Sequence, residues 1–489
     1  MDHSRVPVLE ALEAFRRRGD VVYGPPGHKQ GRGVDPRVLA VLGADLFRAD
    51  VLTLNGLDDR RESQGVLNQA QELMADAVGA DQAFFSTCGS SLSVRTAMLS
   101  TAGPGEKLLL SRNAHKSVIA GVIINGVEPV WVHPHFDAER HMAHPPGPQD
   151  VRRALREHPD ARGMLLITPT DMGTCADVKG VAEVCHAHDV PLIVDEAWGA
   201  HLPFHPDLPA WGMDAEADVV VTSVHKMGGA VEQSSVFHLR GDRVSAKVLK
   251  QREDLLGTTS SSSLVYASLD GWRRHMVEQG RDLLDTALRR AHRVRDAVAA
   301  LPGLRVLGDE VVAPGASADL DVLKVVVDVR ELGITGMQAA EWLRAECHVD
   351  CGASDTCRIV GQFTHADDDG TENLFVDSLR VLTEKAHTIE PRPEVWMPAP
   401  ESFELEQAVL PRRAYFGPTE QVPARKAAGR IAAEVLSPYP PGVPVVAPGE
   451  VVTEEVVHYL RSGVRAGMLV PDAADPSLET LRVMAKGQA

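Results

Sequence analysis

The sequence ADVVVTSVHKMGGA at residues 217–230 carries the strongest local signal of the chain. Its apolar run at 219–222 predicts a strand, and Ser223, His225 and Lys226 follow at the carboxyl end of that strand. A lysine at such a strand end can project into a cleft, where partial burial favours the neutral amine that forms Schiff bases. A lysine after a strand is by itself more typical of a solvated loop. The assignment therefore depends on partners elsewhere in the chain.

The flanking sequence from about residue 70 to 265 alternates helical stretches with short apolar runs. This alternation predicts a mostly parallel α/β sheet, in which functional residues gather at the carboxyl ends of the strands. The expected strands are residues 83–86, 107–111, 129–133, 163–168, 191–195 and 218–223.

An acid in VPLIVDEAWGAH, residues 190–201, is the first partner of Lys226. Asp195 ends a continuous apolar run that is typical of a strand buried on both faces. A buried carboxylate needs a cationic partner, and the protonated pyridine nitrogen of pyridoxal phosphate (PLP) is such a partner. The alternatives are a helix cap and a metal ligand. Because Lys226 follows 31 residues after Asp195, about one αβ unit later, the pair favours a PLP site.

Two further segments could complete that site. In FFSTCGSSLSVRTAML, residues 84–99, a strand is followed by Gly89, Ser90 and Ser91 and then by a helical run. Backbone N–H groups and hydroxyls at a helix N-terminus attract a phosphate dianion, although a helix cap would look the same. In SRNAHKSV, residues 111–118, His115 follows another strand and could lie against a flat ring. Taken singly, this histidine is more typical of a structural residue.

The composition excludes several classes of protein. With 50 Lys and Arg against 68 Asp and Glu, the formal charge of −18 opposes binding to nucleic acid. Six irregularly spaced cysteines and an N-terminus without an apolar signal segment predict a reduced, cytoplasmic protein. No apolar run approaches the roughly 18 residues that a membrane-spanning helix needs.

A chain of 489 residues predicts two or three domains. We expect an N-terminal segment at 1–70 and a large cofactor-binding domain at 71–270. A linker helix at about 271–300 should lead into a small α+β domain that extends to 400, and a C-terminal α+β domain should cover 401–489. The Pro-rich residues 391–411 are typical of a linker.

Six motifs now form a recognisable series: RNAHKSV, the TPT of LITPT, IVDEAWGAHLPFH, TSVHK, TTSSSSLVYASLD and SPYPPGVPVVAPGE. In this order they resemble the ornithine/lysine/arginine decarboxylase family of fold-type I PLP enzymes, in its short bacterial form. The resemblance extends from residue 25 to residue 450. It implies the aspartate-aminotransferase-like fold, with a mostly parallel seven-stranded-type sheet in the large domain and smaller α+β domains after it.

The resemblance also implies roles for individual residues. Lys226 would form the internal aldimine with PLP, Asp195 would hold the pyridinium nitrogen and His115 would stack on the ring. Gly89 belongs to the phosphate turn, and the other matching positions are Ser90, Ser91, Ser223 and His225 near the phosphate and Ala197 and Trp198 beside the ring. In relatives the segment matching Thr258 and Thr259 reaches the phosphate of the neighbouring subunit. A homodimer or larger even assembly with shared active sites is therefore expected.

The implied reaction is decarboxylation of lysine, arginine or ornithine to the amine, through an external aldimine and a quinonoid, with Lys226 or His225 supplying the proton at Cα. Relatives differ at Cys88 and at residues 227–229 and 232, and the adjacent Gly228 and Gly229 are expected to loosen the backbone. Another Cα or Cβ reaction on a basic amino acid, such as oxidation, aldol cleavage or transamination, is the first alternative. A catalytically silent PLP-fold scaffold is the second.

The residue that recognises a cationic side chain is left open by the sequence. The candidate acids are Asp58, Asp59, Glu62, Glu232, Asp355 and Glu434, each of which is more typical of a surface charge. No metal site is expected, because Cys347, Cys351 and Cys357 lack zinc spacing and HPHFDAERHMAH at 133–144 is typical of a surface loop. ADDDGTE at 366–372 favours a helix cap over a calcium loop.

Overall fold

The computed structural model describes residues 1–52, 65–439 and 442–487. The chain divides into two compact units. Unit 1 comprises Met1–Ser100 and Ile193–Leu284, and unit 2 comprises Thr101–Leu192 and Asp285–Ala489. The domain boundaries expected near residues 70, 270 and 400 stay predictions. No helix in the described part of the chain is long and apolar enough to cross a membrane.

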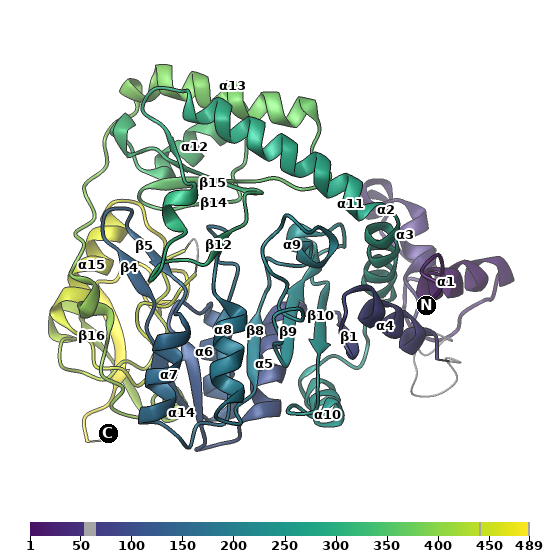
Figure 1. The fold of residues 1–489 in the computed structure, drawn as a ribbon, viewed down its shortest axis with the longest axis horizontal. Helices are drawn as coiled ribbons and strands as arrows, with labels where there is room; N and C mark the ends of the chain where they lie inside the picture. The colour runs from purple at the N-terminus through teal and green to yellow at the C-terminus, as the bar shows by residue number, and fades with distance from the viewer. Residues whose placement is uncertain (53–64, 440–441, 488–489) are drawn as a thin grey trace. The chain divides into compact units, whose positions relative to one another are not determined.

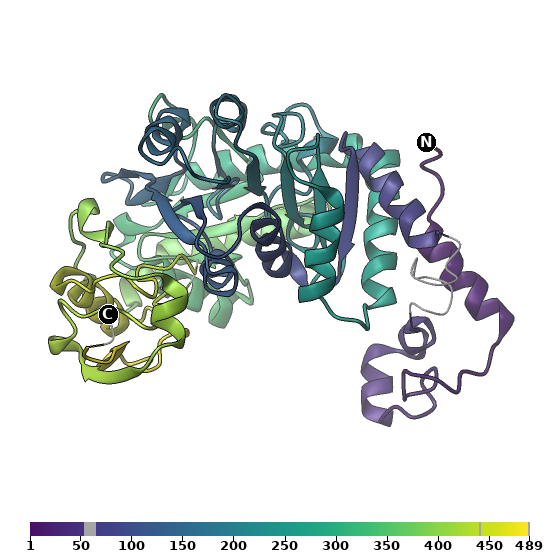
Figure 2. The same cartoon turned by 90° about the horizontal axis from the view of Figure 1, so that it is seen from below.

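Unit 1 contains the strands that flank the predicted lysine (Figure 1). Its elements are α1 (Pro7–Arg18), α2 (Pro36–Leu42), α3 (Ala44–Ala49), α4 (Val66–Ala77), β1 (Gln82–Ser86), α5 (Gly89–Thr101), β8 (Leu192–Asp195), β9 (Val219–Ser223), α9 (Val224–Met227), β10 (Ser235–Leu239), α10 (Ala246–Leu256) and the start of α11 (Ser263–Ala299). Helices α2 and α3, purple in Figure 2, contribute no buried side chain.

The strands of unit 1 form the order β1-β10-β9-β8. β8 and β9 are parallel, whereas β10 runs antiparallel to both β9 and β1. Every residue of β8 and β9 is buried, which is why their sequences are continuous apolar runs rather than alternating ones. Because β8 and β9 are parallel neighbours, their carboxyl ends, at Asp195 and Ser223, lie at the same edge of the sheet.

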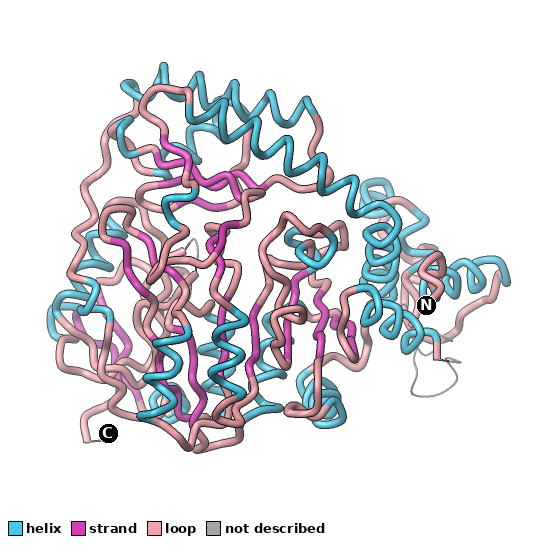
Figure 3. Tube along the Cα trace, in the orientation of Figure 1, coloured by secondary structure: helices cyan, strands magenta, loops and turns pink. Residues whose placement is uncertain are grey.

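Unit 2 alternates strands and helices before passing into smaller sheets (Figure 3). Its first elements are β2 (Lys107–Ser111), α6 (Lys116–Asn125), β3 (Glu128–Val132), β4 (His135–Asp137), β5 (Met142–His144), α7 (Pro148–Glu157), β6 (Met164–Ile167), β7 (Thr174–Cys175) and α8 (Val178–His186). β6, β2 and β3 are parallel neighbours, and β4 and β5 form a hairpin.

The later part of unit 2 forms two smaller α+β regions. The first contains β11 (Arg305–Val306), β12 (Asp319–Leu320), β13 (Lys324–Asp328), α12 (Gly336–Cys347), β14 (Ala353–Ser354), β15 (Arg358–Gln362) and α13 (Asp369–Lys385). The second contains α14 (Pro411–Phe416), β16 (Thr419–Pro423), α15 (Glu454–Arg465) and β17 (Thr480–Met484). Each region has its own core, centred on Val325 and Ile359 in the first and on Val456 and Val483 in the second.

The predicted fold class is confirmed. Seven strands form one sheet in the order β1-β10-β9-β8-β6-β2-β3, and six of them match the expected strands within two residues at either end. β10 is the strand that was not expected. The long helix α11 begins at Ser263, eight residues before the expected start, and ends at Ala299 as expected.

Candidate functional site

Lys226 stands just beyond the carboxyl end of β9, on the short helix α9. The side chain is half-buried, and its Nζ lies 4.2 Å from the centroid of the Trp198 ring. At this distance the ring face attracts a cation, so Trp198 holds the amine in place. Trp198, expected beside the cofactor ring, thus lies against the lysine that was expected to bind the cofactor.

Asp195 ends β8, and its side chain is buried, with 5% of the residue exposed. The backbone N–H of Ala197 donates to the carboxylate, but the buried Oδ1 atom has no hydrogen-bond partner among the described residues. Burial raises the pKa of Asp195 to about 6, against the opposing effects of the Lys226 charge and the Ala197 N–H. A buried acceptor without a donor is costly, and a cationic N–H group placed there would satisfy it.

Glu196, beside Asp195, is a buried acid that the sequence analysis missed. Its Oε2 accepts the backbone N–H of Gly212 at 3.3 Å, and burial raises the pKa of Glu196 well above its usual value. Burial therefore favours the neutral form of the Glu196 carboxyl. The sequence gives no signal for this state, because a second acid after Asp195 would be equally typical of a solvated helix start.

The expected phosphate turn lies at the beginning of α5. Gly89 has φ +73, a left-handed conformation that favours glycine, and its N–H donates to the carbonyl of Gln233 at 2.9 Å. The Ser223 hydroxyl at the end of β9 donates to the Ser90 hydroxyl at 2.6 Å. The structure therefore brings Ser90 and Ser223 together at the first turn of a 13-residue helix, and Ser91 is exposed there.

His225 is fixed by the loop that precedes β10. Its Nδ1 lies 3.1 Å from the carbonyl oxygen of Ser234. A carbonyl only accepts, so Nδ1 carries the proton in this contact and Nε2 is the atom left to exchange a proton. Thr258 and Thr259 are exposed in the segment between α10 and α11.

Gly228 packs closely against two neighbouring residues. A Cβ at this position would come within 2.6 Å of the Val224 carbonyl oxygen and 2.8 Å of the Trp272 ring. The backbone has φ −104, which any residue can adopt. Close packing against Val224 and Trp272 therefore leaves no room for a side chain at this position, and the expected loosening of the backbone stays a prediction.

His115 lies in unit 2 as the N-cap residue of α6. Its Nδ1 accepts the backbone N–H of Ser117 at 3.2 Å, in addition to a contact of 3.0 Å with the Ser117 hydroxyl. The ring is half-buried and therefore keeps an exposed part.

The candidate acids for a cationic substrate have different positions. Glu232 is exposed, whereas Asp355 pairs with Arg358 at 2.8 Å. Glu434 is buried and accepts the backbone N–H groups of Ala474 and Arg482. Asp58, Asp59 and Glu62 lie outside the described residues.

The other polar clusters have structural explanations. In residues 1–52, 65–439 and 442–487, no three His, Cys, Asp or Glu side chains are placed to hold a metal ion. Residues 135–144 form the β4–β5 hairpin, and the six cysteines are free. Asp368 caps α13 by accepting the N–H of Thr371 at 2.9 Å, which confirms the expected helix cap.

The residues of unit 1 fit a pyridine cofactor that carries an aldehyde and a phosphate. The Oδ1 of Asp195, which has no hydrogen-bond partner in the part of the chain that the structure describes, matches a protonated ring nitrogen, and the Lys226 amine matches the aldehyde. The start of α5, with the hydroxyls of Ser90 and Ser223, matches the phosphate. Fold and site together define a PLP enzyme of the aminotransferase-like class.

Comparisons with known proteins narrow this class to a family. The profile of the Orn/Lys/Arg decarboxylase major domain matches residues 6–369, and that of the C-terminal domain matches residues 400–472. A protein of Halalkalibacterium halodurans named arginine decarboxylase is 38% identical over 99% of both chains. One of Bacillus subtilis with the same name is 36% identical over 100% of both. This chain belongs to the Orn/Lys/Arg decarboxylase family, as its motifs predicted.

A solved structure agrees on the fold. The constitutive lysine decarboxylase of Escherichia coli has a TM-score of 0.81 and is 22% identical, and the match covers 99% of this chain and 82% of that one. At this identity the likeness concerns the fold alone.

Proposed function

We propose that this protein is a PLP-dependent arginine decarboxylase, which converts arginine to agmatine and carbon dioxide. One observation carries the chemistry. Within residues 1–52, 65–439 and 442–487, the buried Oδ1 of Asp195 has no hydrogen-bond partner, and Asp195 stands at the same sheet edge as a lysine held against an aromatic ring. Membership of the family supports decarboxylation of a basic amino acid. The relatives that are 38% and 36% identical over almost the whole chain are named for arginine, which favours arginine over lysine and ornithine.

The proposed roles divide among a few side chains of this chain. Lys226 would hold the cofactor through its amine. Asp195 would hold the ring N–H through Oδ1, and the positive charge of the ring would favour the ionised carboxylate. PLP supplies an electron sink for the bond that breaks at Cα. Ser90 and Ser223 bind the phosphate, and Nε2 of His225 and Nζ of Lys226 are the atoms available to return a proton to Cα.

The family resemblance adds three elements to the proposal. His115 would stack on the cofactor ring, and Ala197 would line the same site. Thr258 and Thr259, which are exposed in the single chain, would reach the phosphate held by a neighbouring subunit. A homodimer or a larger even assembly follows from this sharing, and the cytoplasmic location stays a prediction.

Product analysis tests the function directly. The purified protein, loaded with PLP, is incubated separately with arginine, lysine and ornithine, and the products are separated by mass spectrometry. Agmatine from arginine, with much less cadaverine or putrescine, is the expected result, and Lys226→Ala should form none. Keto acid, ammonia, aldehyde or peroxide in place of agmatine would show that another Cα reaction takes place.

A further inference from the structure

Two motifs of the sequence that lie more than 300 residues apart meet in unit 2. Arg112, in RNAHKSV, donates to the carbonyl oxygens of Pro444 and Val445, at 2.5 and 3.1 Å, in the segment SPYPPGVPVVAPGE. The same guanidinium lies 3.1 Å from the carboxylate of Glu450. Glu450 is fully buried and also accepts the backbone N–H of Ala447 at 2.7 Å.

This contact continues along helix α6, which begins next to His115. The backbone N–H of Lys116 donates to the Gly442 carbonyl at 3.3 Å, and its Nζ pairs with Asp472 at 3.0 Å. A Cβ added at Gly442 would lie 3.6 Å from the His115 ring, so Gly442 lies next to that ring. The C-terminal region, residues 401–489, therefore holds Lys116, the first residue of α6, through Gly442 and Asp472.

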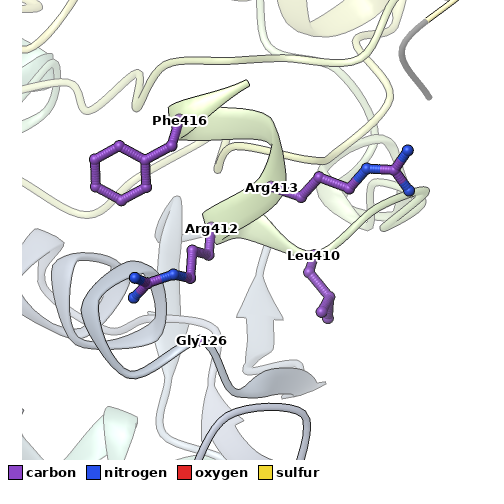
Figure 4. Close-up of a pocket in the computed structure, with 5 residues that line it drawn as sticks. All are labelled: Gly126, Leu410, Arg412, Arg413 and Phe416. Carbon is purple, nitrogen blue, oxygen red and sulfur yellow. The ribbon is translucent and has the colours of Figure 1, made fainter. Parts of the chain in front are cut away.

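The middle and the end of α6 are held by the same region. Ile119 and Ile123 pack against Ala447 in one hydrophobic cluster. Arg412 of α14 donates to the carbonyl of Ile124 at 2.6 Å, and Figure 4 shows its side chain above the turn at Gly126. The helix thus has C-terminal partners at both ends and along one face.

We propose that Arg112 and Glu450 are positioning residues for His115, and that they link the C-terminal region to cofactor binding. A ring that must stack on a cofactor binds it more tightly when the ring is already fixed, because less conformational freedom is lost on binding. The buried ion pair fixes the backbone three residues before His115, and Gly442 lies next to the imidazole. This inference rests on the proposed function, in which His115 stacks on PLP.

The test compares Glu450→Gln with the wild type and with a matched control. Glutamine keeps the size of the side chain and an acceptor, but it removes the charge that holds Arg112. The matched control is Glu372→Gln. Glu372, on α13, forms ion pairs with Arg290 and Arg293 of α11, and the substitution removes its charge. The double variant Arg112→Met/Glu450→Leu removes both buried charges together, which folded proteins tolerate better than one charge left alone.

Two measurements are made on each variant. Hydrogen exchange of residues 112–118 in the cofactor-free protein reports the order of the segment, and PLP titration reports affinity. We expect Glu450→Gln and the double variant to exchange faster and to bind PLP about tenfold more weakly, or about 1.4 kcal/mol. Excess PLP should restore their kcat, which a general loss of folding would not allow. Glu372→Gln should match the wild type.

Unchanged exchange and unchanged PLP affinity in both Arg112–Glu450 variants, with a wild type that takes up PLP, would overturn this inference alone. A wild type that takes up no PLP would overturn the proposed function and the inference with it.

Discussion

Replacing Asp195 by asparagine removes the ionisable carboxylate but keeps the size and shape of the side chain. Burial raises the pKa of Asp195 from its ordinary value of 3.8 to about 6 in the folded protein. Between these two pH values, the folded state holds a proton on Asp195 that the unfolded state has released. Linkage then makes the wild type less stable as pH rises through this window, by about 3 kcal/mol in all. About 1.4 kcal/mol of this loss falls between pH 5 and pH 8.

The introduced amide cannot ionise, so the free energy of unfolding of cofactor-free Asp195→Asn should lack this part of the pH dependence. The amide also leaves an N–H group without an acceptor, which lowers the free energy of unfolding by about 1–3 kcal/mol. Because this cost is the same at every pH, it does not affect the change in stability between pH 5 and pH 8. Urea titrations of both proteins at pH 5 and pH 8 give the difference. Added PLP should stabilise the wild type and have much less effect on the variant. Parallel pH dependence in the two proteins would refute the buried-charge argument.

Three further predictions concern neighbouring residues. Gly228→Ala should lower the free energy of unfolding by about 1–3 kcal/mol, because its Cβ meets the Trp272 ring, and a variant with wild-type urea stability would contradict the packing. Glu196→Gln keeps the bond from Gly212 and removes an acid with a raised pKa, so its stability relative to wild type should increase as pH rises above about 4.5. The opposite trend in urea titrations would contradict a raised pKa of Glu196. Thr258→Ala should weaken PLP binding without changing the melting temperature, and unchanged affinity would argue against a shared site.

The sequence predicted the parts of the fold and site that depend on local pattern. β8 and β9 are continuous apolar runs because both are buried, so Asp195 and Lys226 could be placed at strand ends. β10, with the sequence SVFHL, was missed although it has five residues, as β1, β2, β3 and β9 do. Its antiparallel pairing with β1 and β9 is a tertiary contact that periodicity does not reveal.

Other features depend on contacts between distant residues. The raised pKa of Glu196 follows from its burial, and the need for glycine at residue 228 follows from the Trp272 ring. Arg112 and Glu450 lie 338 residues apart, so their ion pair could not be read from either motif. The resemblance placed both motifs in one family, but only the structure joins them.

The central claim is that the amine of Lys226 binds PLP. Borohydride reduction of the protein incubated with PLP, followed by digestion and mass spectrometry, tests it most directly. We expect a pyridoxyl adduct on the peptide that contains residue 226, and none on the same peptide of Lys226→Ala. An unmodified Lys226 in the wild type, after reduction under saturating PLP, would contradict the claim.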